Sequence, residues 1–360
     1  MTVVRIVLIG DAESPHLLKW ARALDDSAEV ELWVASSRGF MGEFGALVPA
    51  ARRLALHMTV RHAGGNLGPL RKLPALGRWL ASVDADWLHA HYLTSHGTLA
   101  WLAKRGWRLR ARIAGSAWGS DILVTPQRSA AYRWLMRRVL AACALTTSDS
   151  LHMSQRMTEL GAREVMTFPF GLEAMPPQRQ PKQPWLFFAN RGLEPLYRPQ
   201  RVLALFSDIA RARADARLVV ANDGGCRAAL TAQASSLGLA ERIRFVGRLD
   251  AAAQAGWYAD AQWYLSQPSS DSVSVSVLEA MAHGCIPLLS DLPANRELVR
   301  DGENGLIVGD DAGLDIVRLE ALLANAAAVA QTNRSWIEAH ALFGPAVARF
   351  LDRLREIDRQ

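Results

Sequence analysis

Two carboxylates in the last third of the chain have a spacing that suits phosphate chemistry. Asp271 lies in a serine-rich stretch, and Glu279 follows it by eight positions. Apolar residues at helical spacing predict a helix over residues 274–282, and Gly284 stands where a C-terminal cap belongs. The start of a helix offers unpaired backbone N–H groups and a positive dipole end, which attract phosphate. One acid ahead of this helix and one inside it would therefore flank a bound phosphate group.

Taken alone, the two acids also have a purely structural interpretation. Asp271 and the neighbouring serines could cap the helix, and Glu279 could be an ordinary solvated residue. The residues that follow favour the phosphate site, because residues 280–287 (Ala-Met-Ala-His-Gly-Cys-Ile-Pro), 291–297 and 301–305 (Asp-Gly-Glu-Asn-Gly) continue one pattern in register. The whole stretch resembles the C-terminal nucleotide-sugar site of family 4 glycosyltransferases. These are retaining enzymes of the GT-B fold, and the resemblance is to the bacterial polysaccharide or lipid-linked saccharide type.

The resemblance implies a role for each residue of this stretch. In the family the second acid, here Glu279, holds the ribose hydroxyls of the donor. The first acid, here Asp271, lies beside the transferred sugar and the phosphates as part of the catalytic site. The start of the helix, with Ser272, Ser274 and Val275, would contact the donor phosphates. The chain departs from the family pattern because Asp271 replaces the usual Glu and serines replace the usual glycines.

Two arginines are candidates for gripping the diphosphate of the donor. A departing diphosphate carries negative charge, which fixed cations can stabilise. Arg191 lies in a segment that resembles the family's Gly-Arg-Leu segment, so it is the first candidate for both catalysis and donor binding. Arg198 substitutes for the family's nearby lysine, and an ordinary salt bridge is the alternative for either arginine. Gly224 resembles part of the loop beneath the nucleotide, and Arg248 belongs to a segment that resembles the lining of the base.

The first half of the chain resembles the acceptor side of the same family at three places. Ser14 and His16 lie at an expected helix start, where they could meet the acceptor or the donor phosphate, and Ser14 could instead simply cap that helix. His91 is either a catalytic imidazole or a histidine satisfied within its own domain. Asp121 is either an acceptor for a substrate hydroxyl or a turn-forming residue. Trp118 stands where many family members have a histidine near the sugar, so that contact is not carried over.

Short β-branched runs alternate with helical patterns along the chain, which predicts βαβ units and parallel sheets. The expected strands are Val3–Ile9, Val30–Ala35, Trp87–His89, Arg112–Ala114, Leu145–Thr147, Trp185–Ala189, Arg217–Ala221, Ile243–Val246, Gln262–Ser266 and Ile286–Ser290. The fold class is therefore α/β, and the resemblance implies GT-B: two doubly wound, Rossmann-like domains that face a cleft. The expected domains are residues 1–174 and 185–344, joined by a proline-rich linker at 175–184. Trp336–Ile357 forms one amphipathic pattern, and the resemblance implies that a C-terminal helix of about residues 345–360 packs back on the first domain.

Length and composition exclude several classes of protein. The chain has 360 residues, of which 50% are hydrophobic, so two packed domains are possible. The apolar runs are too short to span a bilayer, and the start reads as a buried strand rather than a signal peptide, so we expect a cytoplasmic protein. Three scattered cysteines lack metal-ligand spacing. We expect no disulfide, no metal and no cofactor besides the nucleotide-sugar substrate.

Positive charge is concentrated in the first half of the chain. Residues 1–172 hold 21 Lys and Arg against 13 Asp and Glu, whereas the remainder holds 20 against 22. Between Lys104 and Arg138 nine basic residues accompany one acid. Within this block an apolar helical face opposes Arg133 and Arg137, which suits anionic lipid on the inner face of the plasma membrane and equally a surface helix packed on its own domain. Motifs of nucleic-acid binding are missing from the sequence, so we expect no such partner.

The resemblance implies a metal-independent, retaining hexosyltransferase. By the resemblance, the sugar would pass from a nucleoside-diphosphate donor to a hydroxyl of a lipid-linked or growing saccharide. Two alternatives stay open. One is a non-catalytic partner subunit that binds a nucleotide sugar, and the other is a nucleotide-sugar epimerase on the same fold.

Overall fold

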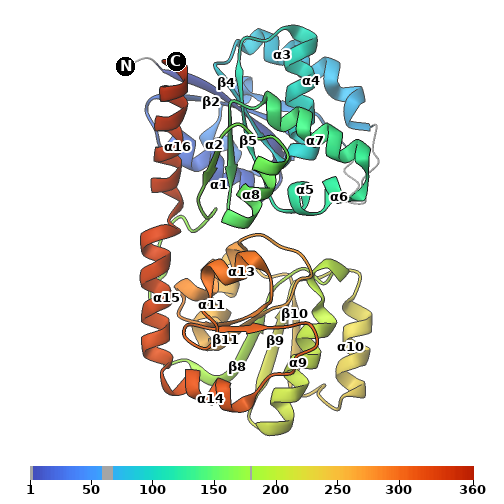
Figure 1. The fold of residues 1–360 in the computed structure, drawn as a ribbon, viewed down its shortest axis with the longest axis vertical. Helices are drawn as coiled ribbons and strands as arrows, with labels where there is room; N and C mark the ends of the chain where they lie inside the picture. Colours follow the sequence, from blue (N-terminus) through green and yellow to red (C-terminus); the bar gives the residue numbers. More distant parts are fainter. Residues whose placement is uncertain (1–2, 59–67, 179–180) are drawn as a thin grey trace. The chain divides into compact units, whose positions relative to one another are not determined.

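The computed structural model describes residues 3–58, 68–178 and 181–360. The chain forms two compact units (Figure 1): an N-terminal unit of residues 1–168 and 343–360, and a C-terminal unit of residues 169–342. The expected domain boundary at residue 174 and the expected linker both fall within the C-terminal unit. Residues 179–180 of that linker lie outside the described part of the chain.

A parallel sheet forms the centre of the N-terminal unit. Within the described residues it has seven strands in the order β3-β2-β1-β4-β5-β6-β7. The strands are β1 (Val4–Ala12), β2 (Val30–Phe40), β3 (Arg53–Ala55), β4 (Trp87–His91), β5 (Arg112–Ser116), β6 (Leu145–Ser148) and β7 (Val165–Thr167). Two strands extend from β1 in one direction and four in the other, so the strand order reverses between β1 and β4. In doubly wound sheets, ligands bind at the carboxyl ends of the strands beside such a reversal.

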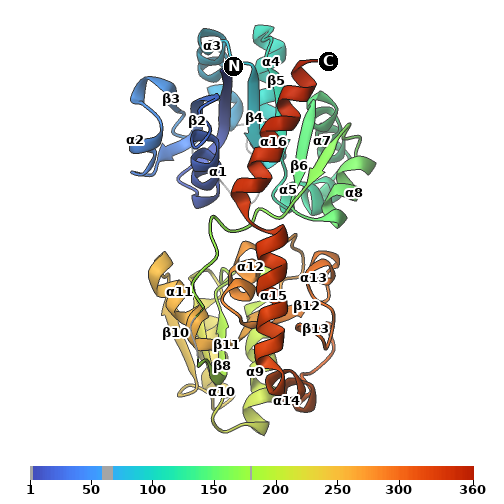
Figure 2. The same cartoon turned by 90° about the vertical axis from the view of Figure 1, so that its left-hand side faces the viewer.

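Helices cover both faces of this sheet. They include α1 (Pro15–Asp25), α2 (Phe44–Leu47), α3 (Leu73–Val83), α4 (Thr98–Trp107), α5 (Ser120–Leu123), α6 (Thr125–Arg128), α7 (Ala130–Ala142), α8 (Leu151–Glu159) and α16 (Phe343–Asp358). α1 and α16 lie side by side (Figure 2), and Trp20 of α1 packs edge-on against Phe343 and Phe350 of α16. The last helix of the chain is thereby part of the N-terminal core.

The C-terminal unit repeats this architecture. Its described strands form a six-stranded parallel sheet in the order β10-β9-β8-β11-β12-β13. They are β8 (Gln183–Ala189), β9 (Arg217–Ala221), β10 (Ile243–Gly247), β11 (Ala261–Ser266), β12 (Ile286–Ser290) and β13 (Leu306–Val308). The helices include α9 (Pro199–Ala212), α10 (Arg227–Ser236), α11 (Ala251–Asp260), α12 (Val275–Ala282), α13 (Pro293–Leu298), α14 (Ile316–Ala324) and α15 (Ala326–His340). Here the strand order reverses between β8 and β11, which places the predicted ligand site at their carboxyl ends.

All ten expected strands are present, and the predicted α/β class with two parallel sheets is confirmed. β4 runs two residues further than expected, so that His91 is its last residue. The strands β3, β7 and β13 were not expected, because three residues are too few to show an alternating pattern.

The continuous pattern expected over Trp336–Ile357 is wrong, because the chain forms two helices there. α15 ends at His340 and α16 begins at Phe343. The Leu172 N–H donates to the Ala341 carbonyl at 2.8 Å, and the backbone at Gly171 approaches so closely that a Cβ atom would lie 1.8 Å from the same oxygen. Pro345 gives a second reason, since in one continuous helix it could not donate to Ala341, whereas the first turn of a new helix tolerates it.

Candidate nucleotide and acceptor sites

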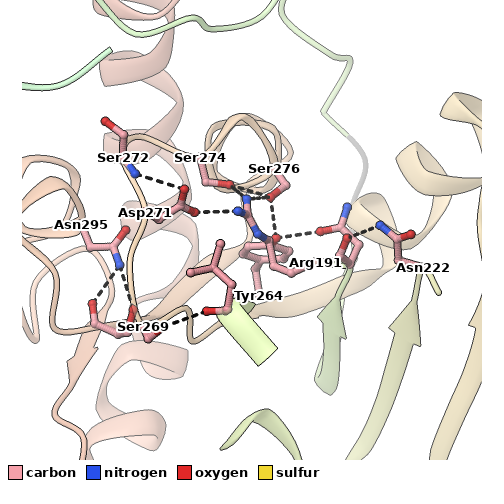
Figure 3. A network of polar contacts seen from close by, with 12 residues as sticks. Arg191, Asn222, Tyr264, Ser269, Asp271, Ser272, Ser274, Ser276 and Asn295 are labelled. Carbon is pink, nitrogen blue, oxygen red and sulfur yellow. Dashed lines mark hydrogen bonds and ion pairs between the residues drawn. The ribbon is translucent and has the colours of Figure 1, made fainter. Parts of the chain in front are cut away.

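Arg191 is the centre of a polar cluster at the carboxyl end of the C-terminal sheet. It follows β8, and its Nη2 atom donates to Asp271 Oδ2 at 2.6 Å. Its Nη1 atom donates to Ser276 Oγ at 3.2 Å and to Ser274 Oγ. Figure 3 shows the guanidinium between the Asp271 loop and the first turn of α12. The structure therefore brings together Arg191, Asp271 and Ser274, which were predicted from separate parts of the sequence.

Burial sets the electrostatics of this pair. The side chains of Arg191 and Asp271 are 18% and 21% exposed. Burial raises the pKa of Asp271, and the guanidinium offsets part of that effect. Burial acts to lower the pKa of Arg191, but Asp271 and neighbouring tyrosines outweigh it, so the pKa lies above its usual value. The guanidinium also lies over the Tyr197 ring, 4.5 Å from its centre. A fixed cation of this kind suits a phosphate ligand.

The Ser274 side chain leaves the first backbone N–H groups of α12 uncapped. Ser274 occupies the N-cap position, yet its hydroxyl makes no cap hydrogen bond. The hydroxyl instead accepts from Arg191 and lies 2.8 Å from Ser276 Oγ. Val275 is the first residue of the helix, and the buried Ser272 donates its backbone N–H to Asp271 Oδ1 at 3.1 Å. The first N–H groups of a helix lack intrahelical partners and attract anions.

Glu279 is held in place by its neighbours, which differs from the solvated-residue interpretation. It is half-buried, and its Oε2 atom accepts from the Tyr258 hydroxyl and from Gln254 Nε2, both at 3.1 Å. Both donors come from α11. A carboxylate fixed in this way can accept ribose hydroxyls with little loss of its own freedom.

Arg198 lies apart from the Arg191 cluster. Its Nε and Nη2 atoms donate to the carbonyls of Gln267 and Pro268 at 2.8 and 3.0 Å, and its Nη1 atom bonds Asp310 at 2.6 Å. These contacts hold the loop that leads from β11 to Asp271. These contacts match the salt-bridge alternative for Arg198. A role of Arg198 in donor binding stays a prediction.

The loops after β9 and β10 complete this edge of the sheet. At Gly224 a Cβ atom would lie 2.5 Å from the Leu193 carbonyl oxygen, so this close approach requires glycine. Gly225 N–H donates to Glu194 Oε1 at 3.0 Å, which ties the glycine loop to the loop that carries Arg191. Arg248 follows β10 and is exposed. The contacts that were predicted for Gly224 and Arg248 with a nucleotide stay predictions.

In the N-terminal unit, His91 and His16 both meet Trp118. The Trp118 Nε1–H donates to His91 Nδ1 at 3.2 Å. The ring of His16 lies 4.7 Å from the Trp118 ring, centre to centre. His91 ends β4, His16 is in the first turn of α1, and Trp118 follows β5. The two predicted residues, His91 and His16, thus converge with Trp118 at the carboxyl edge of the sheet.

His91 is buried and neutral. Burial lowers its pKa well below the usual value, and the nearby His89 adds to this effect. Because its Nδ1 atom accepts from Trp118, its proton is on Nε2. Among the described residues, Nε2 of His91 has no hydrogen-bond partner although it is buried. His89 is also buried and neutral, with its pKa lowered to about 3.

Asp121 and Ser14 both have the structural role that was one of their two interpretations. Asp121 is fully buried, and its carboxylate accepts the backbone N–H groups of Leu93 and Trp118 at 2.8 and 2.9 Å. Burial raises its pKa to about 6. Ser14 is the N-cap of α1 and accepts from the His16 N–H at 3.3 Å. Direct contact of either side chain with an acceptor stays a prediction.

The basic block contains a small cavity on the N-terminal unit. Met136, Val139 and Leu140 of α7 are buried, whereas Arg133 and Arg137 are exposed on the other side of the helix. These two arginines border a cavity of about 330 Å³ whose lining is Ile122, Pro126, Gln127, Arg133, Arg137, Arg156, Glu159 and Leu160. No helix within the described residues is long and apolar enough to cross a bilayer.

Several polar residues of the nucleotide site were missed from the sequence. Asn190, Ser276, Tyr258 and Tyr264 bond to one another around Arg191 and Glu279. The signal was weak but present, since Asn190 directly follows an apolar strand and Tyr264 interrupts another. Polar side chains in buried strands need partners, and ligand sites supply such places.

Comparisons with known proteins agree with this geometry. The family described as Glycosyl transferases group 1 matches residues 173–339, and the family described as Glycosyl transferase 4-like matches residues 5–150. The D-inositol 3-phosphate glycosyltransferase 2 of Catenulispora acidiphila is 26% identical over 93% of this chain and 87% of its own length. The alpha-monoglucosyldiacylglycerol synthase of Streptococcus pneumoniae is 29% identical over 125 residues, which are 35% of this chain and 28% of that relative.

The solved structures share the fold at low sequence identity. Alr3699/HepE of Anabaena, in complex with UDP-glucose, superposes with a TM-score of 0.76 at 13% identity, over 97% of this chain and 99% of that one. The two family matches together cover most of both units, and the two-sheet architecture agrees with them. This chain therefore belongs to the glycosyltransferases of the family 4 type with the GT-B fold.

Proposed function

We propose that the protein is a retaining glycosyltransferase that uses a nucleoside-diphosphate sugar. The observation that carries the proposal is the Arg191 cluster: a half-buried guanidinium stands at the uncapped start of α12, and the fixed carboxylate of Glu279 lies further along the same helix. A cation and a helix N-terminus suit a diphosphate, and a fixed carboxylate suits ribose. The structural neighbour with UDP-glucose supports a donor of this class.

Three groups would act on the donor. Glu279 would accept the ribose hydroxyls, and Arg191 with the α12 start would bind the diphosphate and stabilise its charge as it leaves. Asp271, which bonds Arg191, would orient the guanidinium and lie beside the transferred sugar. In a retaining front-face reaction the bond from the anomeric carbon to the phosphate oxygen breaks, and the acceptor oxygen bonds that carbon on the same face. The acceptor proton passes to the leaving phosphate, so this step requires no protein base.

We assign the acceptor to the N-terminal unit, next to His91, His16 and Trp118. The neutral His91 keeps its proton on a buried Nε2 atom, and the Trp118 indole offers a flat surface beside it. Such groups suit sugar hydroxyls and ring faces rather than a charged ligand. The names of the two relatives pair glycosyl transfer with a diacylglycerol lipid and with inositol 3-phosphate. A lipid-linked or growing saccharide is therefore the acceptor class that we propose.

Donor binding is the first test of this function. Calorimetric titration with UDP-, GDP-, ADP- and TDP-sugars should find one donor, and Glu279→Ala should weaken it at least tenfold. Arg191 supplies the charge in this proposal, so EDTA should leave binding and turnover unchanged. A wild-type protein that binds none of the four donor classes would contradict the proposal.

Product stereochemistry tests the retaining course. With the donor identified and an acceptor found from a panel of lipid-linked saccharides, proton NMR of the first product should show the anomeric configuration of the donor. Inversion would rule out the front-face reaction while leaving the transferase assignment in place.

A non-catalytic partner subunit is the second candidate function. The specific observation in its favour is that Arg191 is already paired with Asp271, an acid shorter than the usual family Glu. Such a subunit would bind the donor with normal affinity, yet it would neither transfer nor hydrolyse the sugar. An epimerase would instead convert the donor sugar without any acceptor, which the same NMR experiment detects.

A further inference from the structure

A continuous chain of hydrogen-bonded polar side chains joins Arg191 to Glu279. It begins where Arg191 Nη1 donates to Ser276 Oγ at 3.2 Å. Ser276 Oγ lies 2.8 Å from the hydroxyl of Tyr264 in β11. Figure 3 shows Tyr264 and Ser276 beside the guanidinium. The two ends of the chain are the groups to which we assign the diphosphate and the ribose.

The middle of the chain runs through Asn190, which follows β8. The Tyr264 hydroxyl donates to Asn190 Oδ1 at 2.7 Å. The Asn190 amide donates through Nδ2 to the Tyr258 hydroxyl, also at 2.7 Å. Tyr258, on α11, donates in turn to Glu279 Oε2 at 3.1 Å. The Ser276 carbonyl is a second acceptor at 3.1 Å, but a carboxylate is the stronger one.

The orientation of the Asn190 amide sets the direction of the hydrogen bonds in this chain. Each tyrosine has one hydroxyl proton, and the amide of Asn190 presents oxygen to Tyr264 and nitrogen to Tyr258. When the single Tyr264 proton lies on Asn190, the hydrogen bond between Tyr264 and Ser276 is donated by Ser276. All links donate from the cation at one end towards the carboxylate at the other. Hydrogen bonds in such an aligned, buried chain polarise and strengthen one another.

The burial of the chain makes each of its links costly to lose. Tyr264 and Tyr258 are 0% and 1% exposed, and Asn190 is 7% exposed. A buried polar group without its partner costs on the order of 1–3 kcal/mol. Burial also raises the pKa of both tyrosines above the usual value, so they keep their protons at neutral pH. Tyr258 is further fixed by Lys182, whose Nζ donates to its carbonyl at 2.6 Å.

A purely structural role is the simpler alternative. Tyr258 and Tyr264 belong to the same hydrophobic cluster as Phe188, so the chain also holds β8, β11 and α11 together. Removal of a structural hydrogen bond would lower stability and weaken all ligand contacts alike. It would not change how strongly the two ends of the chain depend on each other.

We propose that Asn190, Tyr258 and Tyr264 are positioning residues that couple the diphosphate grip of Arg191 to the ribose contact of Glu279. Binding at either end would favour binding at the other, so a nucleoside diphosphate binds more tightly than its two halves predict. The proposal rests on the proposed function, because it assigns nucleotide contacts to both ends.

A double-mutant cycle measures this coupling directly. Calorimetry with UDP, GDP, ADP and TDP first identifies the nucleotide that wild-type protein binds. Dissociation constants then follow for Arg191→Lys, Glu279→Gln and the double variant. In an otherwise wild-type chain, the loss of affinity in the double variant should differ from the product of the two single losses by about fivefold or more. This is the range for residues in one network. With Tyr258→Phe added to all four proteins, the deviation should fall below about twofold.

Two further variants make the result specific. Tyr264→Phe cuts the same chain at another link, and it serves if Tyr258→Phe melts too early to be measured. Tyr132→Phe, on α7 of the N-terminal unit, removes a tyrosine hydroxyl outside the chain and should leave the coupling at its wild-type value.

The outcomes separate the two proposals. Coupling that survives both Tyr258→Phe and Tyr264→Phe, or that is absent from the wild-type background, overturns the positioning role while the nucleotide site stands. A wild-type protein that binds none of the four nucleotides overturns the proposed function and the positioning role together.

Discussion

The two candidate sites of this chain are built from opposite chemistry. Both lie at the carboxyl ends of parallel strands, beside the reversal of strand order. In the C-terminal unit the site contains a guanidinium, two carboxylates and hydroxyls in one bonded cluster. In the N-terminal unit it contains two neutral histidines packed among aromatic rings, and Asp121 is used on backbone N–H groups.

Under the proposed function, this difference suits the two units to two different ligands. A diphosphate needs fixed cations, and the C-terminal unit keeps a charged arginine half-buried by pairing it with an acid. A sugar hydroxyl suits neutral groups, and burial keeps His91 neutral. The contrast also appears in the overall charge, because the N-terminal unit holds 25 Lys and Arg against 16 Asp and Glu, whereas the C-terminal unit holds 16 against 19.

Arg191→Ala should have the largest effect of any single change. It removes the proposed diphosphate contact and leaves Asp271 without its cation. Removing one partner of a buried pair costs about 3–5 kcal/mol, and the partial exposure of this pair puts the loss near the lower end. We therefore expect urea denaturation to show a loss of about 3 kcal/mol in the free energy of unfolding, and donor affinity to fall by about two orders of magnitude.

Two companions of this variant separate binding from folding. Adding Asp271→Asn to Arg191→Ala should recover stability, because the unpaired charge is gone, but not donor affinity. Arg198→Ala should lower stability by freeing the carbonyls of Gln267 and Pro268. It should change donor affinity less than Arg191→Ala does. Equal loss of affinity from both arginines would remove the distinction between the cluster and its supporting loop.

Acid should destabilise the N-terminal site through its histidines. Burial lowers the pKa of His89 from 6.5 to about 3. The folded-state pKa is below the unfolded value, so this stabilising contribution is complete above pH 6.5 and is lost as the pH falls. Between pH 7 and pH 4.5 the loss is about 3 kcal/mol, from about 1.4 kcal/mol for each unit below the unfolded pKa. Urea denaturation of wild type and His89→Gln across this range measures it as the difference between the two slopes.

The acids in the structure act in the opposite sense, which is why the difference between variants matters. Asp121 and Asp271 have raised folded-state pKa values, so their contributions are present at low pH and are lost as the pH rises. They are the same in wild type and His89→Gln and cancel in the comparison. Identical pH slopes for the two proteins would show that His89 is not kept neutral by folding.

The C-terminal site was more predictable from sequence than the N-terminal one. Asp271, Ser274 and Glu279 lie in one short stretch, in the loop before α12, at its N-cap and along the helix, so their spacing along the chain already implies their proximity. Arg191 needed the resemblance as well, because it is distant in sequence and joins them only through strand order. Asn190 and Tyr258 were missed. The signal at Asn190, a polar residue directly after an apolar strand, was weak, and nothing in the sequence of α11 marks Tyr258 as part of a network.

In the N-terminal unit each candidate residue had two valid interpretations from the sequence, and only its burial in the folded chain separates them. Asp121 follows a Gly-Ser turn in either case, but its complete burial and two backbone N–H partners are properties of the folded chain. The break between α15 and α16 was equally hidden, because amphipathic spacing continues across it. Pro345 was the local signal, and it carried more weight than the continuous apolar face.

The basic surface of α7 gives a third way to compare the units. We expect Arg133→Gln with Arg137→Gln to weaken binding to vesicles of phosphatidylglycerol and phosphatidylcholine by about 2 kcal/mol, or roughly thirtyfold, at about 1 kcal/mol per charge near an anionic surface. Co-sedimentation at low salt measures the effect. Arg211→Gln with Arg300→Gln removes the same charge from the C-terminal unit and is the matched control. Equal effects of the two pairs would mean that net charge alone drives adsorption.

Two serines at helix starts give the smallest and most direct test of the contrast. Ser14 caps α1 by accepting the His16 N–H at 3.3 Å, whereas Ser274 makes no cap bond and its hydroxyl bonds Arg191. Ser14→Ala should therefore cost about 1 kcal/mol of unfolding free energy, the usual value for a lost N-cap, and leave donor affinity unchanged. Ser274→Ala should lower donor affinity more than it lowers stability, because Arg191 loses one of the groups that orient it. Urea denaturation and calorimetry on the same two variants decide the matter. If Ser14→Ala lowered donor affinity as much as Ser274→Ala does, the start of α1 would bind phosphate too. The assignment of phosphate binding to the C-terminal unit alone would then be wrong.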